Sequence, residues 1–106
     1  MGVYFVPKLY DHPVEPKLPY SVLSNCYAWV RLRYPTLQGT LFIQKHLQTE
    51  PAKVAVMQYG NLEHYAVVEE VGTSSILISE TNYGGDFYQK RRIQMNDIHL
   101  RGYFKI

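Results

Sequence analysis

Hydrophobic and polar residues divide this chain into one helical segment followed by a series of strands. Ser24 and Asn25 can both cap a helix, and the run that follows them contains no glycine or proline before Pro35, which predicts the first helix. Apolar runs separated by glycine-containing turns predict strands at Val54 to Tyr59, His64 to Val71, Ser75 to Glu80, Tyr88 to Ile93 and Leu100 to Phe104. A helix followed by successive antiparallel strands indicates an α+β fold, in which the helix packs on a sheet of about five strands.

Two other segments give a less regular pattern. Prolines at positions 7, 13, 16 and 19 keep the N-terminal part extended or turning, so residues 1–20 are expected to form an irregular lead-in with a short strand at 3–6. The segment from Thr40 to Gln48 suits a short helix closed by Pro51, but its Leu-Phe-Ile start suits a strand equally well. Both alternatives stay open.

Composition and charge limit the class of protein. The chain has 106 residues and is 46% hydrophobic, which fits a single domain with one core over residues 1–106. A net charge of +2 is too small to indicate a nucleic-acid partner, and the basic run Lys90-Arg91-Arg92 is expected to be a solvated strand end. The N-terminus lacks the features of a signal peptide, and no apolar stretch reaches the roughly 18 residues that span a bilayer. We expect no stable membrane insertion, and a monomer is the default oligomeric state.

The single cysteine, Cys26, falls in the first turn of the predicted helix. One cysteine cannot form an intrachain disulfide, so the thiol is either a small buried side chain or a reactive group. Free backbone N–H groups and the helix dipole favour a thiolate at this position, but a dipole effect of about 0.3 to 1 kcal/mol lowers a thiol pKa by less than about one unit. A reactive Cys26 therefore requires a further contribution, and an imidazolium is the usual one.

The chain offers four histidines as partners. His12 lies in the proline-rich lead-in and His46 in the ambiguous segment, so the direction of neither side chain can be predicted. His99 opens the last predicted strand and remains a candidate. His64 begins a strand that is joined to the next by a short turn, which makes it the preferred partner.

The predicted hairpin brings polar side chains to His64. A three-residue loop at 72–74 sets His64 opposite Asn82 and places Glu80 diagonally on the same face. A loop of four residues would turn Glu80 to the other face, because a slip of one residue inverts the side-chain set. With the first register, either Glu80 or Asn82 can hold one ring nitrogen while the other nitrogen faces Cys26.

These residues, taken in order, resemble a known family. The relevant segments are Asn25-Cys26-Tyr27-Ala28-Trp29-Val30, Val54-Ala55-Val56, His64-Tyr65-Ala66-Val67-Val68-Glu69 and Ile78-Ser79-Glu80-Thr81-Asn82-Tyr83. Together they resemble the CHAP domain, the cysteine- and histidine-dependent amidohydrolases and peptidases of bacterial and bacteriophage cell-wall hydrolases. The resemblance runs from about Tyr20 to the C-terminus. The histidine strand followed by Ile-Ser-Glu-Thr-Asn-Tyr at a hairpin's distance is its most specific part.

The resemblance implies a papain-like fold and a role for each matching residue. It implies Cys26 as nucleophile, His64 as base and then acid, Glu80 as the residue that orients His64, and Asn82 as a further polar residue of the site. Asn25 would act as an oxyanion donor together with the backbone N–H of Cys26. Trp29, Tyr65 and Tyr83, with Tyr59, are candidates to line a substrate groove, although tyrosines in so small a chain mostly serve as half-buried core residues.

The family's activity would be cleavage of an amide bond in peptidoglycan. The bond would lie either between N-acetylmuramic acid and L-alanine or within the stem or cross-bridge peptide. No cofactor is implied, and a metal site is not expected because the candidate ligands lack paired spacing. Without a signal peptide the protein is expected to be phage-borne, as an endolysin or tail-associated lysin, or exported by another route.

One departure from the family pattern favours a different class of function. Family members usually carry Gly-Asp ahead of the Val-Ala-Val strand, whereas this chain has Ala52-Lys53. The alternative is therefore a non-catalytic papain-like module that binds or builds a larger assembly, such as a phage tail.

Overall fold

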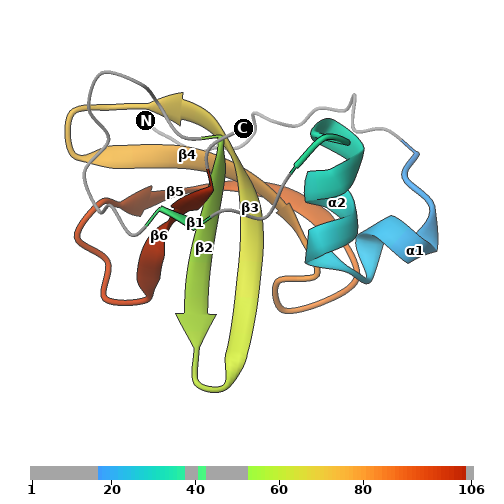
Figure 1. The fold of residues 1–106 in the computed structure, drawn as a ribbon. Helices are drawn as coiled ribbons and strands as arrows, with labels where there is room; N and C mark the ends of the chain where they lie inside the picture. Colours follow the sequence, from blue (N-terminus) through green and yellow to red (C-terminus); the bar gives the residue numbers. More distant parts are fainter. Residues whose placement is uncertain (1–16, 38–40, 43–52, 105–106) are drawn as a thin grey trace.

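The computed structural model describes residues 17–37, 41–42 and 53–104. In chain order the elements are α1 (Tyr20–Leu23), α2 (Cys26–Arg33), β1 (Leu41–Phe42), β2 (Val54–Tyr59), β3 (Leu62–Val71), β4 (Ser75–Thr81), β5 (Tyr88–Gln94) and β6 (Leu100–Phe104). Helices come first and antiparallel strands follow, so the predicted α+β class is confirmed (Figure 1). The strand expected at 3–6 and most of the lead-in lie outside the described residues.

The predicted helix is present, but a short helix that was not predicted precedes it. The Oδ1 atom of Asn25 accepts hydrogen bonds from the N–H groups of Tyr27 at 3.0 Å and Ala28 at 3.2 Å, so Asn25 is the N-cap of α2. Ser24 instead ends α1, where its hydroxyl donates to the carbonyl of Tyr20. Neither of the described helices is long and apolar enough to cross a membrane.

The strands form one sheet in the order β1-β6-β2-β3-β4-β5, with every neighbouring pair antiparallel. Strands β2 and β6 have the predicted bounds, while β3, β4 and β5 each extend further than predicted. Within the ambiguous segment, Leu41 and Phe42 pair with β6 as a strand, and the rest of that segment lies outside the described residues. Strands β2 and β3 are joined by Gly60 and Asn61 alone, and Gly60 takes a φ of 63° that suits glycine.

The loop between β3 and β4 is closed by a different pair than predicted. Ser75 belongs to β4 through its pair with Gln94, but the first pair between β3 and β4 is Val71 with Ile76, so four residues rather than three separate the paired positions. A β-bulge follows, because one extra residue of β3, Glu69, lies between the pairs Val68 with Ile78 and Glu70 with Leu77. From Val68 towards the N-terminus of β3, the register is the one expected for a three-residue loop.

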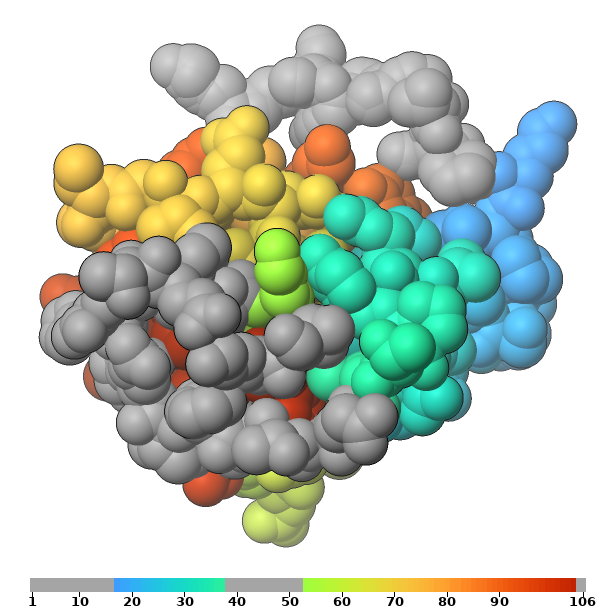
Figure 2. All heavy atoms as spheres, turned by 45° about the horizontal axis from the view of Figure 1, so that its top comes forward, coloured from blue at the N-terminus to red at the C-terminus, as the bar shows by residue number. Residues whose placement is uncertain are grey.

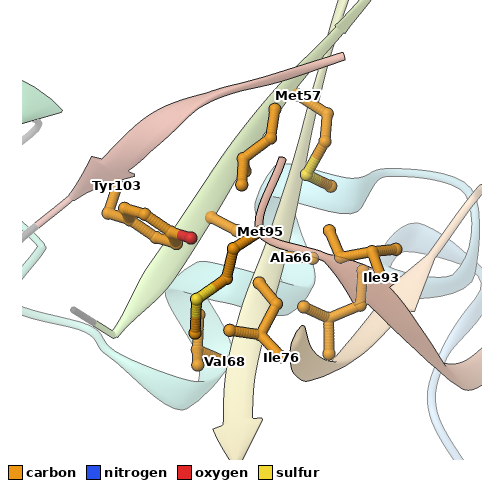
Figure 3. Close-up of a cluster of buried hydrophobic side chains, with 10 residues drawn as sticks. Met57, Ala66, Val68, Ile76, Ile93, Met95 and Tyr103 are labelled. Carbon is orange, nitrogen blue, oxygen red and sulfur yellow. The ribbon is translucent and has the colours of Figure 1, made fainter. Parts of the chain in front are cut away.

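Two faces of the sheet carry separate apolar clusters. Helix α2 covers one face, where Trp29 and Val30 pack on Val54, Val56 and Val67. Figure 1 shows α1 and α2 together on one side of the sheet, and Figure 2 shows their surface continuing into that of the neighbouring strands. The other face carries a cluster that draws on all of the longer strands, drawn in Figure 3: Ala55, Met57, Ala66, Val68, Ile76, Ile78, Ile93, Met95, Leu100 and Tyr103.

Candidate active site

Cys26 is the first residue of α2, and two hydrogen bonds fix this end of the helix on β4. The hydroxyl of Thr81 donates to the carbonyl oxygen of Asn25 at 3.2 Å. One turn further along, the indole Nε1 of Trp29 donates to the hydroxyl of Ser79 at 3.1 Å. The backbone therefore places the thiol beside the strands that carry His64 and Glu80.

The thiol lies at the edge of β3. Strands β3 and β4 are paired from Val71 with Ile76 as far as Val67 with Ser79, so residues 62–66 of β3 continue beyond this ladder. The backbone N–H of Tyr65, in this stretch, is one of the groups that lower the pKa of the Cys26 thiol. The end of α2 thus meets β3 in the stretch of the strand that is not paired with β4.

His64 connects the thiol to a buried carboxylate. Its imidazole is 6% exposed, and its Nε2 atom lies 2.8 Å from Oε1 of Glu80. The imidazole also interacts with the thiol of Cys26, which lowers the pKa of the thiol and raises that of the imidazole. Because Nε2 faces Glu80, Nδ1 is the nitrogen left for the sulfur. The structure brings Cys26, His64 and Glu80 together in one line of contacts.

The protonation of this pair is shifted towards the ionic form. Burial raises the pKa of Cys26, but hydrogen bonds from His64 and the Tyr65 backbone and the charge of His64 outweigh burial and lower it. Burial lowers the pKa of His64, but hydrogen bonds with Cys26 and Glu80 and the negative charges of both raise it to about 9. Both shifts favour a thiolate paired with an imidazolium, which is the reactive state of a catalytic cysteine.

Glu80 is fully buried and is held from two sides. Besides His64, it accepts hydrogen bonds from Arg91 Nε at 2.6 Å and from Gln89 Nε2 at 2.8 Å, both to Oε2. Burial raises the pKa of Glu80, but the bonds from His64 and Arg91 and the charge of Arg91 keep it below its ordinary value. The expectation that the run from Lys90 to Arg92 is a solvated strand end is therefore wrong for Arg91. Strand alternation could have shown this, since Arg91 points to the opposite face from its two basic neighbours.

Aromatic rings surround the imidazole on its remaining side. The ring centroid of His64 lies 5.4 Å from that of Tyr83 and 6.2 Å from that of Tyr59. The guanidinium of Arg91 lies 3.8 Å from the centroid of Tyr83, and His99 packs on Tyr59 at 4.7 Å. Of the predicted groove residues, Tyr83 thus lies against the site, as does Tyr59.

The other two candidate groove residues occupy different places. Trp29 is 6% exposed and contacts Tyr88 edge to face at 5.2 Å, so it is a core residue and not part of a groove. Tyr65 is half-buried beside Cys26, where its ring meets Tyr27 edge to face at 5.1 Å.

The two amide residues lie at the ends of elements. Asn25 adjoins Cys26 and uses its Oδ1 atom to cap α2, which leaves its Nδ2 donors for another acceptor. Asn82 follows β4 with a φ of 59°, is exposed, and donates its backbone N–H to Phe87. Among the described residues, no hydrogen bond joins the Asn82 side chain to His64, whose Nε2 is taken by Glu80.

The remaining histidines do not compete with His64 on the described geometry. His99 pairs with Asp97 at 3.2 Å and reaches the site only through its ring contact with Tyr59. His12 and His46 lie outside the described residues. Within residues 17–37, 41–42 and 53–104, no group of three or more His, Cys, Asp or Glu side chains is arranged to hold a metal ion.

Comparisons with protein-family models, with curated proteins and with solved structures give no match to this chain. The geometry of Cys26, His64 and Glu80 and the resemblance of their sequence segments are therefore the indications of function that this chain offers.

Proposed function

We propose that this protein is a papain-like hydrolase that cleaves amide bonds with Cys26 as its nucleophile. The observation that carries the proposal is the imidazole of His64, which lies 2.8 Å from the buried Glu80 carboxylate and whose interaction with the Cys26 thiol lowers the pKa of that thiol. A nucleophile, a base and a group that orients the base are the three parts that such sites require.

The chemistry follows from the roles of these atoms. The thiolate of Cys26 attacks the amide carbonyl carbon, and the proton on His64 Nδ1 passes to the leaving amine as the carbon–nitrogen bond breaks. Water then attacks the resulting thioester, and His64 takes a proton from that water as the acid is released. Glu80 keeps the ring oriented through Nε2.

A developing oxyanion needs donors next to the sulfur. The backbone N–H of Cys26 and the Nδ2 group of Asn25 are the nearest candidates in the first turn of α2. Such a donor contributes a factor of about 100 to 1000 in rate. The capping bonds of Asn25 Oδ1 at 3.0 and 3.2 Å fix the amide plane that presents Nδ2.

Peptidoglycan is the substrate that the CHAP resemblance supports, with cleavage either at the muramoyl–alanine amide or within the peptides. Action at the bacterial cell wall, as an endolysin or a tail-associated lysin, is part of the same proposal.

Digestion of purified peptidoglycan tests the proposal. The protein and its Cys26→Ala variant are incubated with sacculi, and the released fragments are identified by mass spectrometry. New muramic acid ends identify an amidase, and new peptide ends identify an endopeptidase. Absence of fragments, together with ordinary slow alkylation of Cys26, would instead support a non-catalytic module.

A further inference from the structure

We propose that Arg91 is a positioning residue of this site, which holds the Glu80 carboxylate in the orientation and charge state that keep Cys26 and His64 ionised. The inference rests on the proposed function, because it concerns the same pair. It adds a residue that the sequence pattern assigned to solvent.

The carboxylate of Glu80 has little freedom to turn. Oε1 receives His64 Nε2 at 2.8 Å and Arg91 Nη2 at 3.3 Å, while Oε2 receives Arg91 Nε at 2.6 Å and Gln89 Nε2 at 2.8 Å. The guanidinium fork therefore touches both oxygens and fixes the plane of the group. Since one oxygen stays directed at His64, the Nε2 side of the imidazole is held in one direction as well.

Arg91 is itself held by side chains from two other segments. Its Nη2 donates to the hydroxyl of Tyr59 on β2 at 3.0 Å, and its guanidinium lies 3.8 Å from the ring centroid of Tyr83 after β4. Stacking on a ring and a fork of donors are properties of arginine that lysine does not reproduce. Arg91 therefore connects β2, β4 and β5 around Glu80.

Charge balance gives the second part of the argument. Two negative groups, the Cys26 thiolate and Glu80, face two positive groups, the His64 imidazolium and Arg91. Two further titratable groups, Tyr59 and Tyr83, pack on His64 and contact Arg91. Burial raises the pKa of Tyr59 above its ordinary value, so Tyr59 stays neutral. Removal of Arg91 leaves one excess negative charge, which makes the Cys26 thiolate less favourable.

The test compares two adjacent arginines. Arg91→Met removes the charge and the fork, whereas Arg92→Met is the matched control because Arg92 points to the other face and pairs with exposed Glu70 at 3.3 Å. The alkylation rate of Cys26 by iodoacetamide is measured against pH for the wild type, both variants and Arg91→Lys. Arg91→Met is expected to move the midpoint of the profile upward by about one pH unit, a roughly tenfold slower reaction below the midpoint. Arg92→Met is expected to leave the profile unchanged.

Arg91→Lys retains the charge without the fork, so a smaller upward movement of its midpoint is expected. Thermal unfolding checks that each variant is folded; if Arg91→Met is not, Arg91→Lys decides the question. A folded Arg91→Met variant with the wild-type midpoint overturns the inference. If Arg91→Met does not fold, an Arg91→Lys profile identical to that of the wild type overturns it. If the wild type itself shows the midpoint of an ordinary thiol, the proposed function fails, and the two failures are thereby distinguished.

Discussion

The indole nitrogen of Trp29 lies 3.1 Å from the hydroxyl oxygen of Ser79, a contact between residues 50 positions apart in the chain. The same hydroxyl donates to Glu69 at 2.6 Å, and Glu69 in turn pairs with Arg33 at the end of α2. Both ends of this network lie on the helix that carries Cys26, and its middle lies on the strands that carry Glu80 and His64. The network therefore sets the position of the helix relative to the two strands.

Replacing Trp29 with phenylalanine tests this connection. The variant keeps an aromatic ring against Tyr88 but loses the donor to Ser79, so the free energy of unfolding is expected to fall by about 1 kcal/mol. Ser79→Ala is expected to cost more, about 2 kcal/mol, because it leaves the buried indole N–H without an acceptor. Urea unfolding monitored by circular dichroism measures both values. A Trp29→Phe variant as stable as the wild type would show that the hydrogen bond contributes nothing.

The two functions assigned to Asn25 can be separated by substitution. Serine is as good an N-cap as asparagine, so Asn25→Ser is expected to retain stability within a few tenths of a kcal/mol, whereas Asn25→Ala loses about 1 kcal/mol. Both variants lack the amide donor, and both are expected to hydrolyse substrate about 100-fold more slowly. Chemical denaturation and fragment release from peptidoglycan supply the two readouts. Full activity of Asn25→Ser would remove Asn25 from the oxyanion site.

The dependence of stability on pH should reveal the proton shared by Cys26 and His64. The His64 pKa is raised from 6.5 to about 9, so its contribution is complete below 6.5 and is lost as pH rises through about 9. The Cys26 pKa is lowered from 9.0, so its contribution is complete above 9.0 and is lost as pH falls through the folded value. The two slopes oppose each other where their pH ranges overlap, so the wild type is expected to lose less stability with rising pH than a protein in which His64 titrates without the thiol.

A Cys26→Ala variant is the matched comparison for that measurement. Of the two groups of the pair, only His64 remains in this variant, and Glu80 still raises its pKa. Stability is therefore expected to decline by roughly 1 kcal/mol as pH rises through the His64 pKa. Urea midpoints are recorded at about pH 6.5 and about pH 8.5 for both proteins. A wild-type decline as steep as that of the variant would show that the thiolate does not form.

Substitution of His64 should return Cys26 to an unreactive state. In His64→Ala the thiol loses its hydrogen bond and the neighbouring charge, while burial still raises its pKa. Alkylation by iodoacetamide near neutral pH is expected to slow at least about tenfold. His99→Ala serves as the control, because His99 contacts Tyr59 and not the thiol. Equal labelling rates in the wild type and His64→Ala would contradict the pairing.

Local signals in the sequence were sufficient to predict most of the fold. The cap at Asn25, the breaks at glycine-containing turns and the apolar runs each act within a few residues, so α2 and the five longer strands could be located. The helix at Tyr20–Leu23 was missed because it is a single turn after a proline. The contact between Cys26 and His64 required the resemblance as well, since no local pattern places a helix end against a strand edge.

Long-range contacts account for what the sequence did not predict in the site. Arg91 was read as solvated because it stands between two basic neighbours, and only the fold brings Tyr59 and Tyr83 to it from other segments. Trp29 was named with the other aromatic residues as a groove candidate, and its buried hydrogen bond to Ser79 on a distant strand instead makes it a core residue. In each case a side-chain nitrogen donates its hydrogen bond to a residue that is distant in the sequence, which the pattern of neighbouring residues cannot identify.

The extra residue at Glu69 makes the lengths of two neighbouring segments interdependent. The four-residue turn at 72–75 would by itself direct Glu80 away from His64, and the bulge reverses that inversion before the ladder reaches the site. Loss of a single residue, either at the bulge or in the turn, would therefore separate the acid from the imidazole without altering any residue of the site. Loss of one residue at each place would leave the pair intact, so natural relatives of this hairpin are expected to gain or lose residues at these two positions together.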